Sequence, residues 1–296
     1  MPAPMLQSLA LTALLLHAGG ATAAIETSPP PTPVGTMPLH ADANGRMQAD
    51  VLLDGRGPFR FTVDSAATGV AIAQTLAARL GLRTGAATQV TAGIGDAATR
   101  TVAVDTLRTD LFDLRGAPLP ALPGLAADGV LGMAPFAHGR VELDLTARTL
   151  IASPSAPTPP GFAAIPGQLR HGILIVDVRI DGVPAKALVD TGAPYDIGNP
   201  QLQAALGLTP GDARLSPGGT FADGFGQERM VEQATPARID IGAVTFARPT
   251  VRFADMPVFR TLGLDDGPAL ILGMDQLSRM GAIAIDFPRA ELQLRP

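Results

Sequence analysis

Two aspartates occupy matching positions in the sequence, each following an apolar run and preceding small residues. Residues 61–68 read FTVDSAAT and contain Asp64, and residues 187–194 read ALVDTGAP and contain Asp190. A buried acid at the end of an apolar strand is costly unless it is solvated or hydrogen-bonded. One such aspartate is most simply explained as a cap of the turn, because aspartate is common in turns. Two in equivalent positions indicate a shared chemical role.

Asp64 and Asp190 would meet if the segments around them pack about a pseudo-twofold axis. Two carboxylates about 3 Å apart do not both ionise easily, so they share a proton. One member then acts as a base and the other as an acid on a water held between them. This arrangement hydrolyses an amide without a metal ion, thiol or serine nucleophile, and it favours acidic to mildly acidic pH.

The aspartate motifs belong to a longer internal repeat. Residues 129–133 (GVLGM) match residues 270–274 (LILGM), and residues 141–145 (VELDL) match residues 283–287 (IAIDF). These blocks follow the two aspartates in the same order. Duplication of one unit of roughly 115 residues explains that order better than chance does.

The composition favours short strands joined by turns. The 296 residues include 33 Gly and 28 Pro, a share that is high for a helical protein. Periodicity and turn signals predict strands at 59–64, 173–180, 185–190 and 282–287, and short helices at 72–80, 200–206 and 275–280. We therefore predict an all-β fold of two lobes related by a pseudo-twofold axis, each with one or two short helices.

The N-terminus predicts export. Residues 9–18 are apolar but too short to span a bilayer comfortably, and Ala-Thr-Ala at 21–23 fits a cleavage site. We predict a signal peptide at 1–24 and a periplasmic or secreted mature protein, although residues 1–8 contain no Lys or Arg. A disordered apolar terminus on a cytosolic protein is the alternative.

Two proline-rich stretches mark the other boundaries. The first predicts a linker at 25–36, because dense proline forms an extended spacer. The second, at 153–160, lies near the middle of the mature chain. We place a lobe boundary there, between an N-terminal lobe at 37–154 and a C-terminal lobe at 155–296.

Composition and charge exclude several classes of protein. The net charge of −5 argues against nucleic acid as a partner. The absence of cysteine excludes a thiol nucleophile, disulfides and thiolate metal sites. The four histidines lack metal-ligand spacing, so neither a metal nor a cofactor is predicted. We expect a peptide or protein substrate, no membrane anchor after signal cleavage, and a monomer, because both aspartates lie in one chain.

Three segments of the second half resemble a known family. Residues 190–193 (DTGA), 270–273 (LILG) and 283–287 (IAIDF) are similar to the signatures of the pepsin/retropepsin-like aspartic proteases. With the matching first-half segments, the resemblance covers nearly all of residues 37–296. The chain looks like a bacterial exported member with two retropepsin-like units.

The resemblance implies roles for five residues. Asp64 and Asp190 would form the catalytic dyad. Ser65 and Thr191 would tie the two catalytic loops together by hydrogen bonds. Gly192, at the third position of the family motif, would allow the backbone to approach closely.

Ala66 departs from the family pattern, which has glycine at this position. Its methyl group adds bulk where two backbones and two carboxylates crowd, and alanine restricts positive φ angles. Either the loop adjusts or the dyad is displaced. A displacement of about 1 Å costs on the order of a hundredfold in rate.

Four residues are candidates for a substrate cleft: Thr68, Tyr195, Ile94 and Phe221. Ile94 and Phe221 lie in the glycine-rich segments 91–95 and 218–226, which are candidates for the flap that the family places over its cleft. Ordinary hairpin turns explain these glycines equally well. Thr68 and Tyr195 follow the two aspartate motifs.

The sequence supports an aspartic endopeptidase that hydrolyses peptide bonds with a shared-proton dyad of Asp64 and Asp190. The alternative is a non-catalytic peptide-binding protein on the same fold, impaired by Ala66. A third reading makes the aspartates turn caps only. Substitution of Ala66 by glycine separates the first two, because it raises activity only if the dyad is present but impaired.

Overall fold

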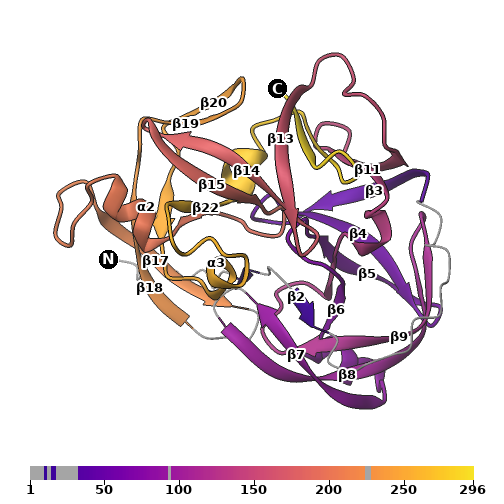
Figure 1. Cartoon of the computed structure of the whole chain (residues 1–296). Helices are drawn as coiled ribbons and strands as arrows, with labels where there is room; N and C mark the ends of the chain where they lie inside the picture. The colour runs from indigo at the N-terminus through magenta and orange to yellow at the C-terminus, as the bar shows by residue number, and fades with distance from the viewer. Residues whose placement is uncertain (1–9, 12–14, 18–32, 93–94, 224–227) are drawn as a thin grey trace.

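The computed structural model of the protein describes residues 10–11, 15–17, 33–92, 95–223 and 228–296 (Figure 1). Regular structure in these residues is mostly β, as predicted. The first part of the chain contains β3 (Gly35–Ala41), β4 (Met47–Leu53), β5 (Arg56–Val63), β6 (Val70–Ala73), α1 (Gln74–Leu80), β7 (Thr84–Ala92), β8 (Gly95–Arg108), β9 (Asp113–Leu122), β10 (Gly129–Leu131), a 3-10 helix (Ala134–Phe136), β11 (Gly139–Asp144) and β12 (Thr149–Pro154).

The second part repeats much of this order. It contains β13 (Ala163–Arg170), β14 (Ile173–Ile180), β15 (Val183–Val189), β16 (Asp196–Gly198), α2 (Pro200–Ala205), β17 (Ser216–Asp223), β18 (Glu228–Ala234), β19 (Arg238–Ile241), β20 (Val244–Ala247), β21 (Val251–Phe253), α3 (Pro257–Thr261), β22 (Ala269–Leu272), α4 (Met274–Leu277), β23 (Ala282–Asp286) and β24 (Glu291–Arg295). No helix in the described residues is long and apolar enough to cross a membrane.

The internal repeat is visible as matching strand pairs. In the first lobe β5 pairs in parallel with β10, and β10 pairs antiparallel with β6. In the second lobe β15, β22 and β16 are arranged in the same way. The strand before each motif aspartate therefore lies beside the strand of the matching Leu-Gly block.

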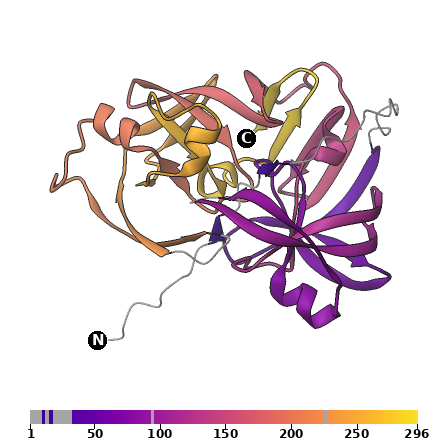
Figure 2. The same ribbon diagram turned by 60° about the horizontal axis from the view of Figure 1, so that its bottom comes forward.

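One sheet joins the two lobes. Its strands follow the order β3, β12, β11, β23, β24 and β13, all antiparallel. The central pair, β11 and β23, holds the two segments that the sequence matched as VELDL and IAIDF. The two lobes lie side by side around this sheet (Figure 2), which agrees with two units related by a pseudo-twofold axis.

Strand periodicity explains the core. In β4, Met47, Ala49, Val51 and Leu53 are buried, while the residues between them are half-buried, because successive strand side chains point to opposite faces. The strands next to the motif aspartates are more deeply enclosed. β10, β16 and β22 are buried along their whole length, so the aspartates are held by rigid elements.

Three helix predictions need correction. The helix predicted at 72–80 begins at Gln74, because Val70–Ala73 forms β6 and hydrogen-bonds to β10. The helix predicted at 275–280 is the shorter α4. The C-terminal lobe has three helices, one more than predicted, since α3 lies in the longer connection from β21 to β22. Residues 254–268 form that connection, whereas 123–128 form its counterpart.

The N-terminal segment includes two short strands. β1 (Ala10–Leu11) pairs with β17, and β2 (Leu15–His17) pairs with β7. Most of residues 1–32 lie outside the described residues, so the signal peptide and the linker stay predictions. β3 already begins at Gly35, inside the predicted linker.

Candidate active site

The two motif aspartates are held by the same backbone contact in each lobe. Asp64 follows β5, and its backbone N–H donates to the Leu131 carbonyl of β10 at 3.0 Å. Asp190 follows β15, and its N–H donates to the Leu272 carbonyl of β22, also at 3.0 Å. Each Leu-Gly strand thus fixes the loop that starts at its aspartate.

Ser65 and Thr191 link the two loops by four buried hydrogen bonds. The Ser65 N–H donates to Thr191 Oγ1, and the Thr191 N–H donates to Ser65 Oγ, both at 3.0 Å. The Ser65 hydroxyl donates to the Val189 carbonyl at 2.8 Å, and the Thr191 hydroxyl donates to the Val63 carbonyl at 2.9 Å. Each loop is therefore anchored to the strand of the opposite lobe, which brings Asp64 and Asp190 together.

The two carboxyl groups are fully buried and unequally hydrogen-bonded. Asp64 Oδ1 accepts the Ala66 N–H at 2.8 Å. Asp190 Oδ1 accepts two donors, the N–H groups of Gly192 at 2.8 Å and Ala193 at 2.9 Å. Oδ2 of each aspartate is buried and has no hydrogen-bond partner among the described residues. One proton shared between the carboxyls would give these oxygens a partner.

Burial raises the pKa of both carboxyl groups. Burial, together with the charge of Asp190, raises the pKa of Asp64 well above its ordinary value. Burial also raises the pKa of Asp190, but the Ala193 and Gly192 N–H groups oppose this and leave that pKa at about 6. Two backbone donors at Asp190 against one at Asp64 favour the charged form on Asp190 and the proton on Asp64.

Arg46 is a buried cation that sequence reasoning missed. Its guanidinium forms an ion pair with Asp42 at 2.7 Å, and its side chain is only 6% exposed. Its positive charge lowers the pKa of both Asp64 and Asp190. No local pattern identifies this role, because β4 and β5 separate Arg46 from Asp64 in the chain and the charge of Arg46 acts on the two aspartates only after folding.

Gly192 lies against the Asp64 carboxyl group. A Cβ atom added at Gly192 would overlap Asp64 Oδ2 and Cγ. The pseudo-equivalent residue, Ala66, carries a real methyl group and is fully buried in an apolar cluster of the C-terminal lobe that includes Ile173, Leu188 and Phe259. The fold thus accommodates alanine on one side of the dyad, while its N–H still binds Asp64.

Substitution of Ala66 by glycine is expected to lower the free energy of unfolding by about 1–2 kcal/mol, because it removes a buried methyl group and adds backbone freedom. We expect kcat/KM to change by less than about fivefold, an effect well below that of a displaced dyad. Denaturant unfolding and peptide hydrolysis check the two values. A tenfold rise in kcat/KM would instead show that Ala66 impairs the dyad.

The structure describes the side chains of two of the four predicted cleft residues. Thr68 and Tyr195 are half-buried, and each follows its aspartate in the loop. Ile94 lies outside the described residues, as does the side chain of Phe221. The described residues on either side of these positions belong to paired strands, β7 with β8 and β17 with β18. The assignment of a flap stays a prediction.

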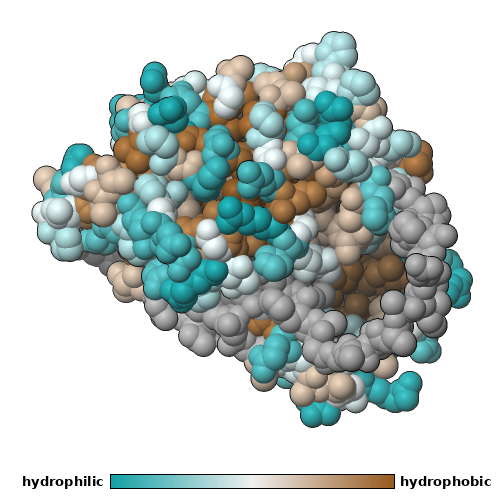
Figure 3. All heavy atoms as spheres, in the orientation of Figure 1, coloured by the Kyte–Doolittle hydropathy of each residue, from teal (hydrophilic) through white to brown (hydrophobic). Residues whose placement is uncertain are grey.

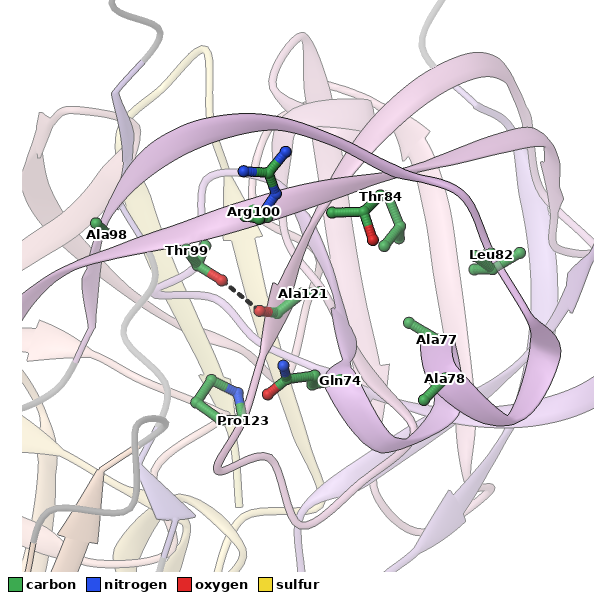
Figure 4. A pocket seen from close by; sticks show the side chains of 11 residues that line it. Gln74, Ala77, Ala78, Leu82, Thr84, Ala98, Thr99, Arg100, Ala121 and Pro123 are labelled. Atoms are coloured by element: carbon green, nitrogen blue, oxygen red, sulfur yellow. Dashed lines mark hydrogen bonds between the residues drawn. The ribbon is translucent and has the colours of Figure 1, made fainter.

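Pockets also occur away from the dyad. One of about 470 Å³ lies between α1 and β7–β9 in the N-terminal lobe (Figure 4). Another of about 530 Å³ lies beside α2 and β17 in the C-terminal lobe. On the face drawn in Figure 3, hydrophobic residues are visible between hydrophilic ones and inside a hollow at the right of the view. No group of three or more acidic or histidine side chains suited to a metal occurs in the described residues.

Comparison with known protein families identifies one family that matches most of the chain. The profile of a family described as aspartyl protease matches residues 49–134 and 176–276. The chain belongs to the aspartyl protease family. The two matched regions contain the two aspartate motifs and both Leu-Gly blocks of this family member. No curated protein matches the chain.

Proposed function

We propose that the protein is an aspartic endopeptidase in which Asp64 and Asp190 act together on one water molecule. The observation that carries this proposal is the pairing of two fully buried carboxyl groups from the two lobes, each with one oxygen that has no partner among the described residues. Family membership supports a protease-type activity. The assignment of Asp64 and Asp190 as the catalytic pair rests on the burial and the hydrogen bonds of their carboxyl groups.

Asp190 is the base in this proposal, because two backbone N–H groups stabilise its carboxylate. It takes a proton from the water as the water oxygen bonds to the peptide carbonyl carbon. Asp64 gives its proton to the carbonyl oxygen. In the tetrahedral intermediate, Asp190 returns its proton to the amide nitrogen, the C–N bond breaks, and one hydroxyl proton goes back to Asp64.

The proposed substrates are peptides or unfolded protein segments, and the proposed location is the periplasm or the exterior. One chain suffices for catalysis, because Ser65 and Thr191 join the two loops within it. The proposed unit is therefore a monomer.

The experiment that tests this function is cleavage of an unfolded protein mixture, with mass spectrometry of the new termini. The purified protein is compared in EDTA with the double variant Asp64→Asn/Asp190→Asn, which controls for contaminating proteases. New termini made by the wild type alone support the proposal. Peptide binding by folded wild type without cleavage at any pH favours the non-catalytic alternative.

The pH profile should follow the first ionisation of the pair. Because the pKa of Asp190 is about 6, its carboxylate becomes scarcer as the pH falls below that value. We expect kcat/KM to fall about tenfold per pH unit there, and to fall at high pH when Asp64 loses its proton. Hydrolysis rates from pH 3 to 9 check this. A maximum near pH 3 would show that the first ionisation of the pair lies well below pH 6 and would contradict this profile.

A further inference from the structure

A second group of ionisable residues lies behind the C-terminal catalytic loop and is not used by the proposed reaction. It consists of Tyr195, Asp196, Arg252 and Asp275, whose counterparts in the N-terminal lobe are Gly69, Val70, Pro120 and Ala134. Equivalent hydrogen bonds support this match, since Met133 N–H donates to Ala67 O at 2.9 Å and Met274 N–H donates to Ala193 O at 2.8 Å. The fold therefore forms this loop without charges in one lobe and with them in the other.

Asp196 and Asp275 fasten the loop to the start of α4. Asp196 is fully buried, and its Oδ1 accepts the Gly273 N–H at 2.8 Å. Asp275 Oδ1 accepts the Asp196 N–H at 3.1 Å, and the Asp275 N–H donates to the Pro194 carbonyl at 3.1 Å. The other oxygen of Asp196, Oδ2, has no hydrogen-bond partner among the described residues.

Arg252 supplies one positive charge to these two acids. Its guanidinium carbon lies 3.6 Å from the centre of the Tyr195 ring, and its Nε donates to the Gly218 carbonyl of β17 at 3.2 Å. Burial raises the pKa of Asp196 well above its ordinary value and also raises the pKa of Asp275. The charge of Asp275 raises the pKa of Asp196, and a hydrogen bond with Asp196 lowers the pKa of Asp275. The positive charge of Arg252 lowers the pKa of both acids. Arg252 carries one positive charge and can balance only one of the two carboxylates.

We propose that Asp196 and Asp275 share one proton and form a pH-dependent latch that holds the C-terminal catalytic loop against α4. With the proton present, the two acids and Arg252 have no net charge. Loss of the proton leaves an unbalanced buried negative charge between residues 194–196 and 273–275, and the two segments then separate. The proposal goes beyond peptide hydrolysis and does not depend on it.

The sign of the effect on stability follows from the raised pKa values. An acid with a higher pKa in the folded state than in the unfolded state contributes its full stabilisation below the unfolded value. That contribution is lost as the pH rises toward the folded value. The latch therefore holds in acid and opens at higher pH. Because Tyr195 directly precedes Asp196, opening changes the surroundings of its ring.

Tyr195 is a selective probe of this change, because the chain contains one tyrosine and no tryptophan. Near-ultraviolet circular dichroism from pH 4 to 9 should show a transition in the wild type, below the range where tyrosine itself ionises. Asp275→Asn keeps the size and hydrogen bonding of the side chain but does not ionise, so most of the amplitude should be lost. Arg252→Gln removes the counter-charge and should shift the midpoint upward by about one pH unit or more.

Asp64→Asn is the control, because the catalytic dyad also has raised pKa values. It should keep the Tyr195 transition, and it shows that the signal is separate from catalysis. Melting temperatures at pH 5 and pH 8 give a second measurement, and their difference should be smaller in Asp275→Asn than in the wild type. A wild-type transition in Asp275→Asn, or an unshifted midpoint in Arg252→Gln, would overturn the latch even if peptide hydrolysis is confirmed.

Discussion

Replacement of either Asp64 or Asp190 by asparagine is expected to lower kcat/KM by about a thousandfold or more. Asparagine has nearly the same shape but neither takes a proton from water nor returns one to the substrate. Because the proposed reaction moves protons through both groups, the two single variants should be similarly inactive. Steady-state hydrolysis of a peptide identified in the cleavage mixture gives the values.

Folding controls separate this loss from misfolding. The raised pKa values mean that ionised buried carboxyls cost stability at neutral pH, so each asparagine variant should melt at pH 7 no earlier than the wild type. Asp105→Asn, at an exposed aspartate, is the matched control and should keep full activity. If a well-folded Asp64→Asn or Asp190→Asn protein kept a tenth of wild-type activity, the proposed dyad would be wrong.

Substitution of Gly192 by alanine is expected to lower the hydrolysis rate strongly. The added methyl group would overlap the Asp64 carboxyl, which is confined by burial and by the Ala66 N–H. A displacement of about 1 Å at the reacting groups should lower the rate on the order of a hundredfold. The loss should be mainly in kcat, since the substitution disturbs the dyad and leaves the surrounding surface unchanged.

Gly267→Ala is the matched control for Gly192→Ala. No atom lies within 4 Å of a Cβ built at Gly267, so this variant should have wild-type activity. Comparison of kcat and KM for the two variants tests whether the effect comes from the position at the dyad. Activity of Gly192→Ala within threefold of the wild type would mean that catalysis tolerates displacement of the Asp64 carboxyl.

Several elements were predictable because their causes are local. Residues 173–180 form β14 as predicted, since their apolar side chains suit a buried strand. The helix expected at 200–206 is α2, which begins at Pro200 after the Asn199 cap. The helix expected at 72–80 begins at Gln74 instead, because Ile72 fits either a helix or a strand. Its pairing with Gly129 of β10 decides for the strand.

The all-β class, the duplicated unit and the two aspartates can be predicted from the sequence, because repetition and periodicity are visible in the order of the residues. The difference between the two aspartates arises only in the folded protein, where Asp190 accepts two backbone donors and Asp64 accepts one. Folding also brings the charge of Arg46 close enough to lower the pKa of both aspartates, and it brings the Gly273 N–H to the Asp196 carboxyl group. These contacts join segments far apart in the chain, and their energies depend on a burial that exists only after the lobes pack.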